Sequence, residues 1–394
     1  MLRIIVATHE RWLDSLHGAS IIRLFESLSS LGYSIVLLMF SSESKVVQVG
    51  QLRIETLGVK RWLPVITIMR IYFHFLSLIL RDRRASAIIV DSLLLPMLLP
   101  ARVVHKTTGV MLNLSRPVLV GGVLGKIRLL RFRFSLMLAK HLAEVITAIS
   151  PFEAREFSKL GRIPEEQMVI ISSPIDSIFT RQKLHRDMNQ TRRRLGIGHL
   201  AGKKILLYHG ALEEARGTVE FVAAFARAFL DRPDVALLIV GEGSARALVE
   251  DRIRRDSMVN CFLISSVPYS TVPELISACD LGLVILPNHE WWRYQCPTRL
   301  AEFLAMGKPV VATDLPGIRW VAQSSKLVTY LRNLEIDEVR NAIERALKQA
   351  DPRTAHTDID LVGMFTTKSL ARRLDSVLRQ GKIHRFNERT NAED

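Results

Sequence analysis

The sequence contains few cysteines and no recognisable metal-binding or nucleic-acid-binding motif. Its 394 residues include three cysteines, Cys261, Cys279 and Cys296, and none of them has CxxC or metal-ligand spacing. We expect reduced thiols in a cytosolic setting rather than a disulfide framework. No zinc-ligand set and no aromatic RNA-binding strand motif is present, so we do not expect nucleic acid to be a partner.

The sequence also lacks an uninterrupted hydrophobic run of membrane-spanning length. The nearest candidate is 62–80, in which Pro64, Arg70 and His74 interrupt an otherwise apolar stretch. An arginine at the centre of a spanning helix costs about 2.5–3.5 kcal/mol on insertion. The stretch therefore predicts a buried or interfacial helix. The apolar run at the amino terminus is too short for a signal peptide and predicts a first strand.

Positive charge is what the sequence has in excess. Lysine and arginine number 54, against 39 aspartates and glutamates, which gives a formal net charge of +15. This balance favours polyanions such as nucleic acid, anionic lipid headgroups or phosphorylated substrates, and does not choose among them. With 48% hydrophobic residues, the composition is that of a globular protein with a large core, and the length suits two domains.

Short apolar runs alternate with helical patterns in both halves of the chain, which predicts βαβ units and parallel sheets. We predict a first domain at 1–177 and a second at 204–364. The basic, strand-poor segment 178–203 between them is predicted as a linker. A helix at about 365–382 is expected to pack back on the first domain, and 383–394 is expected to be a polar tail.

Residues that directly follow the strands are the first site candidates, because ligands of open α/β sheets bind at the carboxyl ends of strands. Gly18 follows the first strand and opens a helix, whose amides favour anions. Gly210 follows the run "ILLYH", and Arg216 lies six residues later, which suits a diphosphate. The alternatives are a tight turn without a ligand and a surface ion pair of Arg216 with Glu213 or Glu214.

A single carboxylate, Glu302, stands shortly before a Gly-Lys-Pro break. The predicted helix that carries Glu302 ends at Gly307, and the β-branched run 310–312 predicts a buried parallel strand. The carboxylate would then face a ligand at the rim of a sheet. The alternative is a helix N-terminal charge that the helix dipole favours.

Several ordered segments resemble the GT-B glycosyltransferases, specifically glycosyltransferase family 4. They include "VITAISPFEAREFSKLG", "ILLYHGALEEARG", "LLIVGEG" and "PTRLAEFLAMGKPVVATDLPG". The resemblance runs from about residue 1 to residue 375 and is strongest over 145–320. It implies an α/β protein of the GT-B class, with two Rossmann-like domains whose parallel sheets face each other across a cleft.

The resemblance also implies roles for particular residues. Glu302 matches the family glutamate that binds the ribose hydroxyls of a nucleotide-sugar. Arg216 matches the basic residue that grips the diphosphate. The stretch from Pro297 to Glu302 is similar to a P-x-K-L-x-E variant of the family, in which Arg299 supplies the cation.

Three places depart from the family pattern. Ala211 replaces an arginine of the diphosphate loop, and Tyr294 replaces the first glutamate of the E-x7-E pair. In the first domain, the loop that carries a catalytic His or Asp in some relatives has Ser115 and Arg116, so no acid or base is assigned. The predicted site comprises Arg216 and Arg299 for catalysis, Gly210, Tyr294, Thr298 and Glu302 with both arginines for donor binding, and Gly18, Ser115 and Arg116 for the first-domain cleft.

The resemblance implies a retaining glycosyltransferase, with a hexosyl group expected, that uses a nucleotide-sugar and needs no metal or other cofactor. Arg216, Arg299 and the amides around Gly210 would neutralise the leaving diphosphate. The only D-x-D, Asp358-Ile359-Asp360, follows the nucleotide motifs and is expected at the surface. A GT-B nucleotide-sugar epimerase and a non-catalytic polyanion-binding protein on a degenerate scaffold remain alternatives.

Residues 125–140 predict a helix that is apolar on two sides when plotted at about 100° per residue. The predicted core stripe is Val123, Ile127, Leu130, Phe134 and Leu138. The predicted outer strip is Leu129, Phe132 and Leu136, between Lys126, Arg133 and Lys140 on one side and Arg128 on the other.

An apolar strip between basic residues suits an anionic membrane surface, although burial of the helix on both sides fits the same pattern. We therefore expect a cytoplasmic protein that binds peripherally to the inner face of the cell membrane. The expected acceptor is lipid-linked or a precursor of an envelope glycan.

Overall fold

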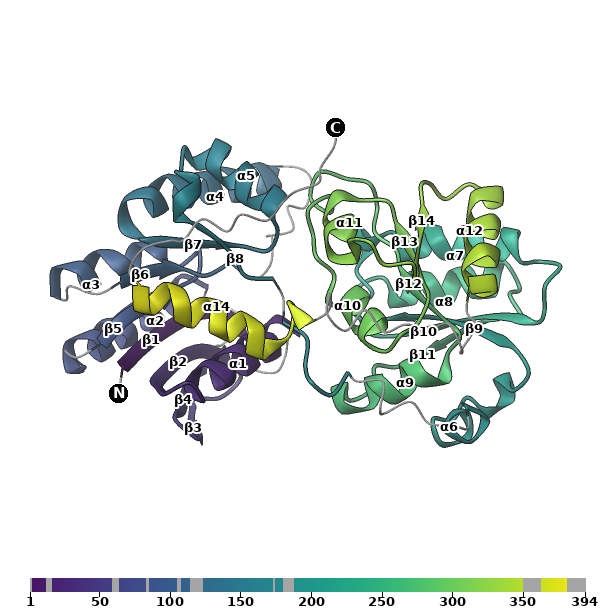
Figure 1. The fold of residues 1–394 in the computed structure, drawn as a ribbon, viewed down its shortest axis with the longest axis horizontal. Helices are drawn as coiled ribbons and strands as arrows, with labels where there is room; N and C mark the ends of the chain where they lie inside the picture. The colour runs from purple at the N-terminus through teal and green to yellow at the C-terminus, as the bar shows by residue number, and fades with distance from the viewer. Residues whose placement is uncertain are drawn as a thin grey trace. The chain divides into compact units, whose positions relative to one another are not determined.

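The computed structural model describes residues 2–11, 16–58, 64–82, 85–104, 108–113, 123–172, 174–179, 188–349 and 363–380. The chain divides into two compact units. Unit 1 comprises Met1–Pro174 together with Thr367–Asp394, and unit 2 comprises Ile175–Thr366. Each unit is built on its own sheet with helices packed on it (Figure 1).

The sheet of unit 1 has eight strands in the order β3-β4-β2-β1-β5-β6-β7-β8. All neighbours pair in parallel except β3 and β4, which form an antiparallel edge pair. The strands are β1 (Leu2–Arg11), β2 (Tyr33–Ser41), β3 (Lys45–Val49), β4 (Leu52–Gly58), β5 (Ala85–Val90), β6 (Thr108–Met111), β7 (Val145–Ala148) and β8 (Met168–Ile170). The helices are α1 (Leu16–Ser29), α2 (Pro64–Arg81), α3 (Leu98–Val104), α4 (Val123–Leu142), α5 (Pro151–Gly161) and α14 (Thr367–Gln380).

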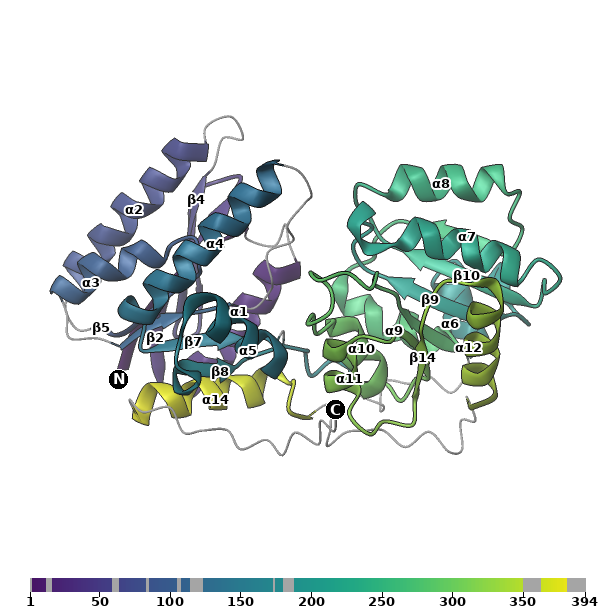
Figure 2. The same ribbon diagram turned by 90° about the horizontal axis from the view of Figure 1, so that it is seen from above.

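Successive side chains of β1 enter two different cores, as the two-residue period of a strand requires. Ile4 and Val6 pack with residues of α1 and α14. Ile5 and Ala7 pack with residues of α2, α3, α4 and α5. The helices α2 to α5 therefore form one layer over the sheet, and α1 and α14 cover its other face (Figure 2).

The helix α14 lies within the predicted range 365–382 and packs on unit 1. Leu370 and Leu374 are buried in the core that α1 shares. The hydroxyl of Tyr33, at the start of β2, donates a 2.6 Å hydrogen bond to the carboxylate of Asp375. The chain thus passes from unit 1 to unit 2 and returns to unit 1 for its last described helix.

Unit 2 has a six-stranded parallel sheet in the order β11-β10-β9-β12-β13-β14. The strands are β9 (Lys204–His209), β10 (Val235–Val240), β11 (Cys261–Ile264), β12 (Leu281–Val284), β13 (Val310–Thr313) and β14 (Val328–Leu331). The helices are α6 (Met188–Arg194), α7 (Thr218–Ala228), α8 (Arg246–Arg255), α9 (Val272–Ala278), α10 (Thr298–Ala305), α11 (Pro316–Ala322) and α12 (Ile336–Gln349). One core lies between the sheet and α9 to α11, and the other between the sheet and α7, α8 and α12.

The segment 178–203 is not a linker throughout, which corrects the sequence-based prediction. The helix α6 lies in it and belongs to unit 2. Arg192 of α6 is buried, donates from Nε to the carbonyl oxygen of Ala278 at 2.9 Å and pairs with Asp280 at 2.9 Å. A basic composition suggested exposure, but this arginine is buried because a carboxylate and a carbonyl oxygen satisfy its guanidinium group.

The prediction of which side of α4 is buried was wrong, and the buried and exposed sides are exchanged in the structure. Phe132 and Leu136, predicted to face a membrane, are 7% and 0% exposed and lie in the core of unit 1. Leu130 and Phe134, predicted as core, are 70% and 59% exposed, and Ile127 is 57% exposed.

Small side chains give a physical reason for this orientation of α4. Gly125, Ser135 and Ala139 are buried on the same side of the helix as Phe132 and Leu136. They leave room for the larger side chains to interdigitate with the layer beneath, as dense core packing requires. The hydrophobic period alone could not choose, since both sides of α4 are apolar.

The stretch 62–80 corresponds largely to α2, which is buried on one side only. Ile71, Phe75 and Ile79 lie in the core, whereas Phe73 is 66% exposed. Among the helices of the described ranges, none combines the length and the apolar character needed to cross a membrane.

Candidate functional site

The candidate site lies where the strand order of unit 2 reverses. From β9 the sheet grows through β10 to β11 on one side, and β12 then starts the other side. Connections leave β9 and β12 in opposite directions, which opens a crevice at the carboxyl ends of strands in sheets of this type. Gly210 and Arg216 follow β9, whereas Tyr294, Arg299 and Glu302 follow β12. The topology therefore brings the predicted donor-binding residues to one edge of the sheet.

Glycines shape the turn after β9. Gly210 has a φ of +119°, a conformation that glycine adopts readily, and its N–H donates to the carbonyl oxygen of Val240 at 3.0 Å. A Cβ on Gly241 would clash with the carbonyl oxygen of Gly210, and a Cβ on Gly243 would clash with that of Leu212. The "GEG" motif after β10 is thus required for the close approach of the two loops.

Two arginines gather around Tyr208, the penultimate residue of β9. The guanidinium carbon of Arg299 lies 4.5 Å from the centre of the Tyr208 ring, and that of Arg216 lies 5.2 Å from the ring of Trp292. Nη1 of Arg299 and Nε of Arg216 are buried and have no hydrogen-bond partner among the described residues. Buried guanidinium nitrogens of this kind are suited to an anionic ligand.

The electrostatics show that these two arginines act on each other and on Tyr208. Burial and the charge of Arg299 lower the pKa of Arg216 to about 10. Burial by itself raises the pKa of Tyr208, but the charges of Arg299 and Arg216 outweigh it and leave this pKa below its usual value. The repulsion between like charges held together in this way is relieved when an anion binds between them.

Glu302 lies on α10, one turn after Arg299, and is buried. The hydroxyl of Tyr269 donates to Oε1 of Glu302 at 3.2 Å. Oε2 of Glu302 lies 3.5 Å from Nε2 of His209 without forming a hydrogen bond. Burial and the charge of Arg299 lower the pKa of His209 to about 3, so this imidazole is neutral near pH 7. Tyr269 and His209 therefore line the carboxylate as uncharged groups.

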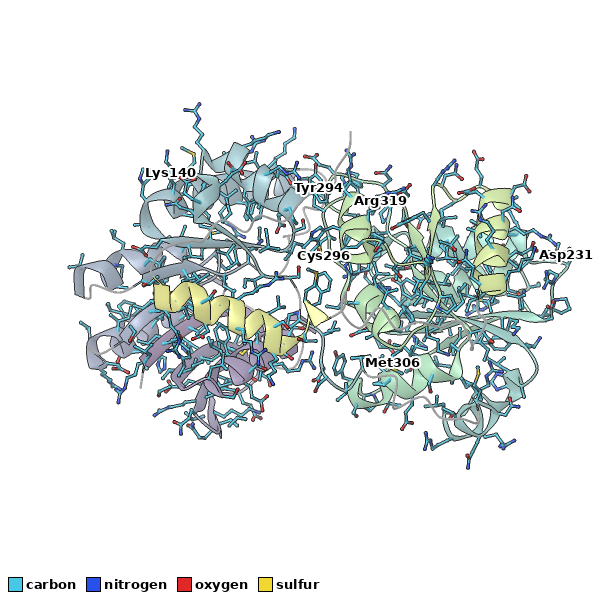
Figure 3. The ribbon with its side chains drawn as sticks, viewed as in Figure 1. Lys140, Asp231, Tyr294, Cys296, Met306 and Arg319 are labelled. Carbon is cyan, nitrogen blue, oxygen red and sulfur yellow. The ribbon has the colours of Figure 1, made fainter. Side chains whose placement is uncertain are left out.

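Thr298 and Tyr294 are half-buried residues on the approach to α10. Thr298 is the first residue of that helix, and Tyr294 lies in the loop before it (Figure 3). Gly317 supports this loop, since its N–H donates to the carbonyl oxygen of Arg293 at 2.8 Å and a Cβ there would clash with the carbonyl oxygen of Gln295. The loop is thus held in place by the start of α11.

The residues predicted for the first-domain cleft are only partly described. Gly18 lies within α1, and Ser115 and Arg116 lie outside the described residues. At the carboxyl ends of β6 and β7, the N–H of Asn113 donates to Oγ1 of Thr147 at 2.7 Å, and Nδ2 of Asn113 donates to Glu153 at 3.3 Å. This part of unit 1 is therefore polar and hydrogen-bonded.

The Asp358–Asp360 motif lies outside the described residues. Within the described ranges, no group of His, Cys, Asp and Glu side chains is arranged to hold a metal ion.

Several residues of the site were not predicted from the sequence, among them Tyr208, His209, Tyr269 and Trp292. Tyr208 and His209 end a strand that was predicted, and their position at a strand end was the available signal. Tyr269 had no such signal, because it lies in a short turn after β11 that only the three-dimensional fold brings to Glu302.

The Gly-Lys-Pro break after α10 has a structural role. Gly307 has a φ of +65°, which ends the helix. Nζ of Lys308 donates to the carbonyl oxygens of Ser277 at 3.0 Å and Cys279 at 2.6 Å, and burial lowers the pKa of Lys308. This lysine satisfies carbonyl groups at the carboxyl end of α9, where a cation is favourable.

Residues 203–349 match the family model described as glycosyl transferases group 1. Over this range, unit 2 is similar to the group 1 glycosyltransferases. The match begins just before β9 and ends with α12, so it includes Gly210, Arg216, Arg299 and Glu302.

Two curated proteins are similar to part of this chain. Alpha-D-kanosaminyltransferase of Streptomyces kanamyceticus is 23% identical over 200 residues, which cover 50% of this chain and 50% of that protein. TuaH of Bacillus subtilis, described as a teichuronic acid biosynthesis glycosyltransferase, is 25% identical over 179 residues, which cover 44% of this chain and 41% of that protein. The matches thus span about half the length of these relatives or less.

Solved structures match over nearly the whole chain. HepE of Anabaena, in complex with UDP and glucose, has a TM-score of 0.72 at 14% identity, and the match covers 96% of this chain and 100% of HepE. Sucrose-phosphate synthase of Thermosynechococcus elongatus has a TM-score of 0.72 at 15% identity, with coverage of 96% and 99%. At this level of identity the similarity concerns the fold. The predicted GT-B fold, with two Rossmann-like units, is confirmed.

Proposed function

We propose that this chain transfers a sugar from a nucleoside-diphosphate donor to a hydroxyl acceptor. One observation carries the proposal: Arg216 and Arg299 place buried guanidinium nitrogens without protein partners, among the described residues, at the strand-order reversal of unit 2. A diphosphate supplies the negative charge and the acceptor oxygens that this arrangement suits. The names of the curated relatives and the UDP bound to HepE support the same conclusion.

In this proposal each side chain binds one part of the donor. Arg216, Arg299 and the amides around Gly210 bind the diphosphate. The carboxylate of Glu302, with Tyr269 donating to its other oxygen, accepts hydrogen bonds from the ribose hydroxyls. Thr298 and Tyr294 border the donor from the loop before α10 and from its first turn.

The reaction breaks the bond between the anomeric carbon of the sugar and the diphosphate oxygen and forms a bond from that carbon to the acceptor oxygen. The acceptor hydroxyl proton leaves with the diphosphate or passes to solvent. The two arginines stabilise the negative charge that develops on the leaving diphosphate, so no metal ion is required for that purpose. Retention of anomeric configuration and a hexosyl donor belong to the proposal through the family resemblance.

The proposed acceptor is lipid-linked or an envelope-glycan precursor, and the proposed location is the cytoplasmic face of the membrane. The net charge of +15 supports an anionic surface as a partner, and the description of TuaH supports a glycan product.

The test is a calorimetric titration with UDP, GDP and dTDP, followed by transfer and hydrolysis assays with a panel of nucleotide-sugars in EDTA. We expect one nucleotide to bind and its sugar to be transferred to an added acceptor without added metal. Isomerisation of the donor sugar without an acceptor would identify an epimerase. Absence of nucleotide binding would indicate a non-catalytic protein, and a strict requirement for Mn²⁺ or Mg²⁺ would contradict the role given to the arginines.

A further inference from the structure

Exposed apolar side chains are concentrated on three helices of unit 1. Among the described residues, fifteen large hydrophobic side chains are exposed, and nine of them lie on α2, α3 and α4. These nine, here called the apolar face, are Met69, Phe73 and Leu80 on α2, Leu99 and Val103 on α3, and Ile127, Leu130, Phe134 and Met137 on α4. Patches of exposed apolar side chains of this kind mark interaction sites rather than ordinary surface.

The nine side chains point in one direction because the three helices share one layer. On α2 and α4, the exposed residues recur at spacings of three, four or seven, which is one stripe of a helix. The opposite stripe of each of the three helices is buried against the same face of the sheet, through Phe75, Leu98 and Leu136. The exposed stripes therefore all face away from that sheet, on helices that lie together (Figure 2).

The charges on these helices have one sign. The helices contain 18, 7 and 20 residues and carry two, one and five lysines or arginines, with no aspartate or glutamate. The chain as a whole has 39 acidic residues among 394, so several would be present at the average density. Arg70, Arg81, Lys126, Arg131 and Arg133 are exposed beside the apolar face.

We propose that the apolar face docks on the surface of an anionic lipid bilayer. Apolar side chains enter the boundary between headgroups and acyl chains, and the flanking cations bind the anionic headgroups. A second copy of this chain is a poorer occupant, because a two-fold interface would bring two faces of the same positive sign together. This proposal rests on the membrane association proposed above and assigns it to the apolar face. It does not depend on the nucleotide chemistry of unit 2.

The test uses the full chain and two pairs of substitutions in sedimentation with vesicles of phosphatidylglycerol and phosphatidylcholine. Leu130→Gln with Phe134→Gln changes the apolar face and keeps good helix formers on α4. Leu230→Gln with Val259→Gln is the matched control, since both side chains are exposed in unit 2 at 86% and 80%. We expect the first pair to weaken vesicle binding at least tenfold and the control pair to leave it unchanged. Wild-type binding should fall as salt rises and should be absent with phosphatidylcholine alone.

A second pair guards against unfolding of α4. Met69→Gln with Phe73→Gln alters the same face from α2, and thermal melts show which variants are folded. Vesicle binding by a folded variant of either pair at wild-type affinity would overturn the proposal, as would absence of binding by the wild type. A wild-type dimer that the first pair converts to a monomer, with no vesicle binding, would assign the face to a second copy. UDP affinity, measured on the same samples, should be unaltered in all variants, so failure of the nucleotide proposal would be seen separately.

Discussion

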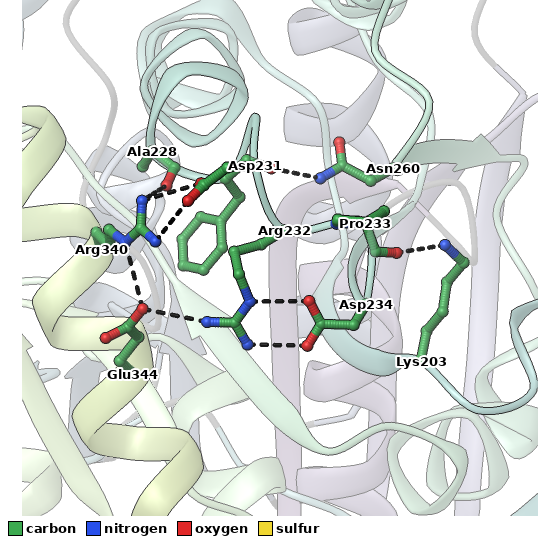
Figure 4. A network of polar contacts seen from close by, with 10 residues as sticks. Lys203, Ala228, Asp231, Arg232, Pro233, Asp234, Asn260, Arg340 and Glu344 are labelled. Carbon is green, nitrogen blue, oxygen red and sulfur yellow. Dashed lines mark hydrogen bonds and ion pairs between the residues drawn. The ribbon is translucent and has the colours of Figure 1, made fainter.

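The outer helices of unit 2 carry paired charges of both signs, whereas α2 to α4 of unit 1 carry cations and exposed apolar side chains. In unit 2, Arg340 of α12 pairs with Asp231 at 2.9 Å, and Arg232 pairs with Asp234 at 2.8 Å and with Glu344 at 3.3 Å (Figure 4). The helices α2, α3 and α4 of unit 1 have no acidic residue with which their arginines and lysines could pair within a helix. Unit 2 presents a surface suited to water, and unit 1 presents one that is suited to an anionic, apolar partner.

A second contrast lies within unit 2. Its peripheral arginines are satisfied by carboxylates, yet Arg216 and Arg299 keep buried nitrogens without partners among the described residues. Among the described arginines of unit 2, these two are the ones with a buried nitrogen that lacks a hydrogen-bond partner, which suits the anion of the proposed donor. The difference between the two groups of arginines therefore locates the proposed donor site more sharply than charge content does.

The largest effect should come from removing one of the two arginines that have a buried nitrogen without a hydrogen-bond partner. We expect Arg299→Ala to slow transfer by about 100-fold or more, since one lost electrostatic contact to a developing charge costs about 2.7–4 kcal/mol, and to weaken UDP binding as well. Arg299→Lys should retain part of the activity because it keeps the charge and loses the planar fork. For both variants, calorimetry measures the UDP affinity and initial rates measure the transfer activity.

Arg255→Ala on α8 is the matched control, because Arg255 is an exposed arginine that pairs with Asp251. It should leave UDP affinity unchanged. Equal UDP affinities for wild type and Arg299→Ala would show that the buried nitrogen of Arg299 without a hydrogen-bond partner does not mark a diphosphate site.

The next effect concerns stability and separates the two sides of α4. Leu136→Ala should lower the free energy of unfolding by about 2–5 kcal/mol, because it leaves a cavity in the core of unit 1. Leu130→Ala, on the 70% exposed side chain of the same helix, should change it by no more than about 0.5 kcal/mol. Urea denaturation, monitored by circular dichroism, measures both free energies of unfolding. A larger loss in Leu130→Ala than in Leu136→Ala would mean that the other side of α4 is buried.

Much of the fold could be predicted from the sequence, because its signals are local. Strand-like apolar runs predicted β9, β10 and β13. The spacing from Gly210 to Arg216 and the family resemblance at Arg299 and Glu302 predicted residues that the structure brings to one sheet edge. These positions were predictable because the carboxyl ends of parallel strands meet at one edge whatever the packing.

What the sequence did not predict depends on packing between distant segments. The hydroxyl of Tyr269 reaches Glu302 across 33 residues, and the buried Arg192 reaches Asp280 across 88. The orientation of α4 was missed because both of its sides are apolar, so only contact with the sheet decides which one is buried. Hydrophobic periodicity predicts that a segment is helical, and tertiary contacts decide which side of the helix is buried.

A smaller effect should follow from the single hydrogen bond behind Glu302. Tyr269→Phe removes the hydroxyl that donates to Oε1, and such a bond contributes about 0.5–1.5 kcal/mol. Donor affinity should therefore fall by roughly 2- to 10-fold, measured by titration with UDP. Tyr330→Phe on β14 is the matched control and should leave affinity unaltered. An unchanged affinity in Tyr269→Phe would show that this tyrosine does not help to hold the carboxylate.

The smallest effect is expected at the paired periphery of unit 2, in Asp231→Asn. The hydrogen bond from Arg340 is the main cause that lowers the pKa of Asp231, so the pair stabilises the fold at pH values above the ordinary carboxyl pKa. This contribution is lost as pH falls below about 4 and the carboxylate is protonated. Asp231 is exposed and Arg340 is partly exposed, so the loss in melting temperature should be slight at pH 7 in low salt. It should vanish in about 1 M salt, where the screening length is about 3 Å. A large loss that persisted in high salt would mean that these outer pairs behave like buried ones, and the contrast between the two units would then rest on the apolar side chains of α2 to α4 alone.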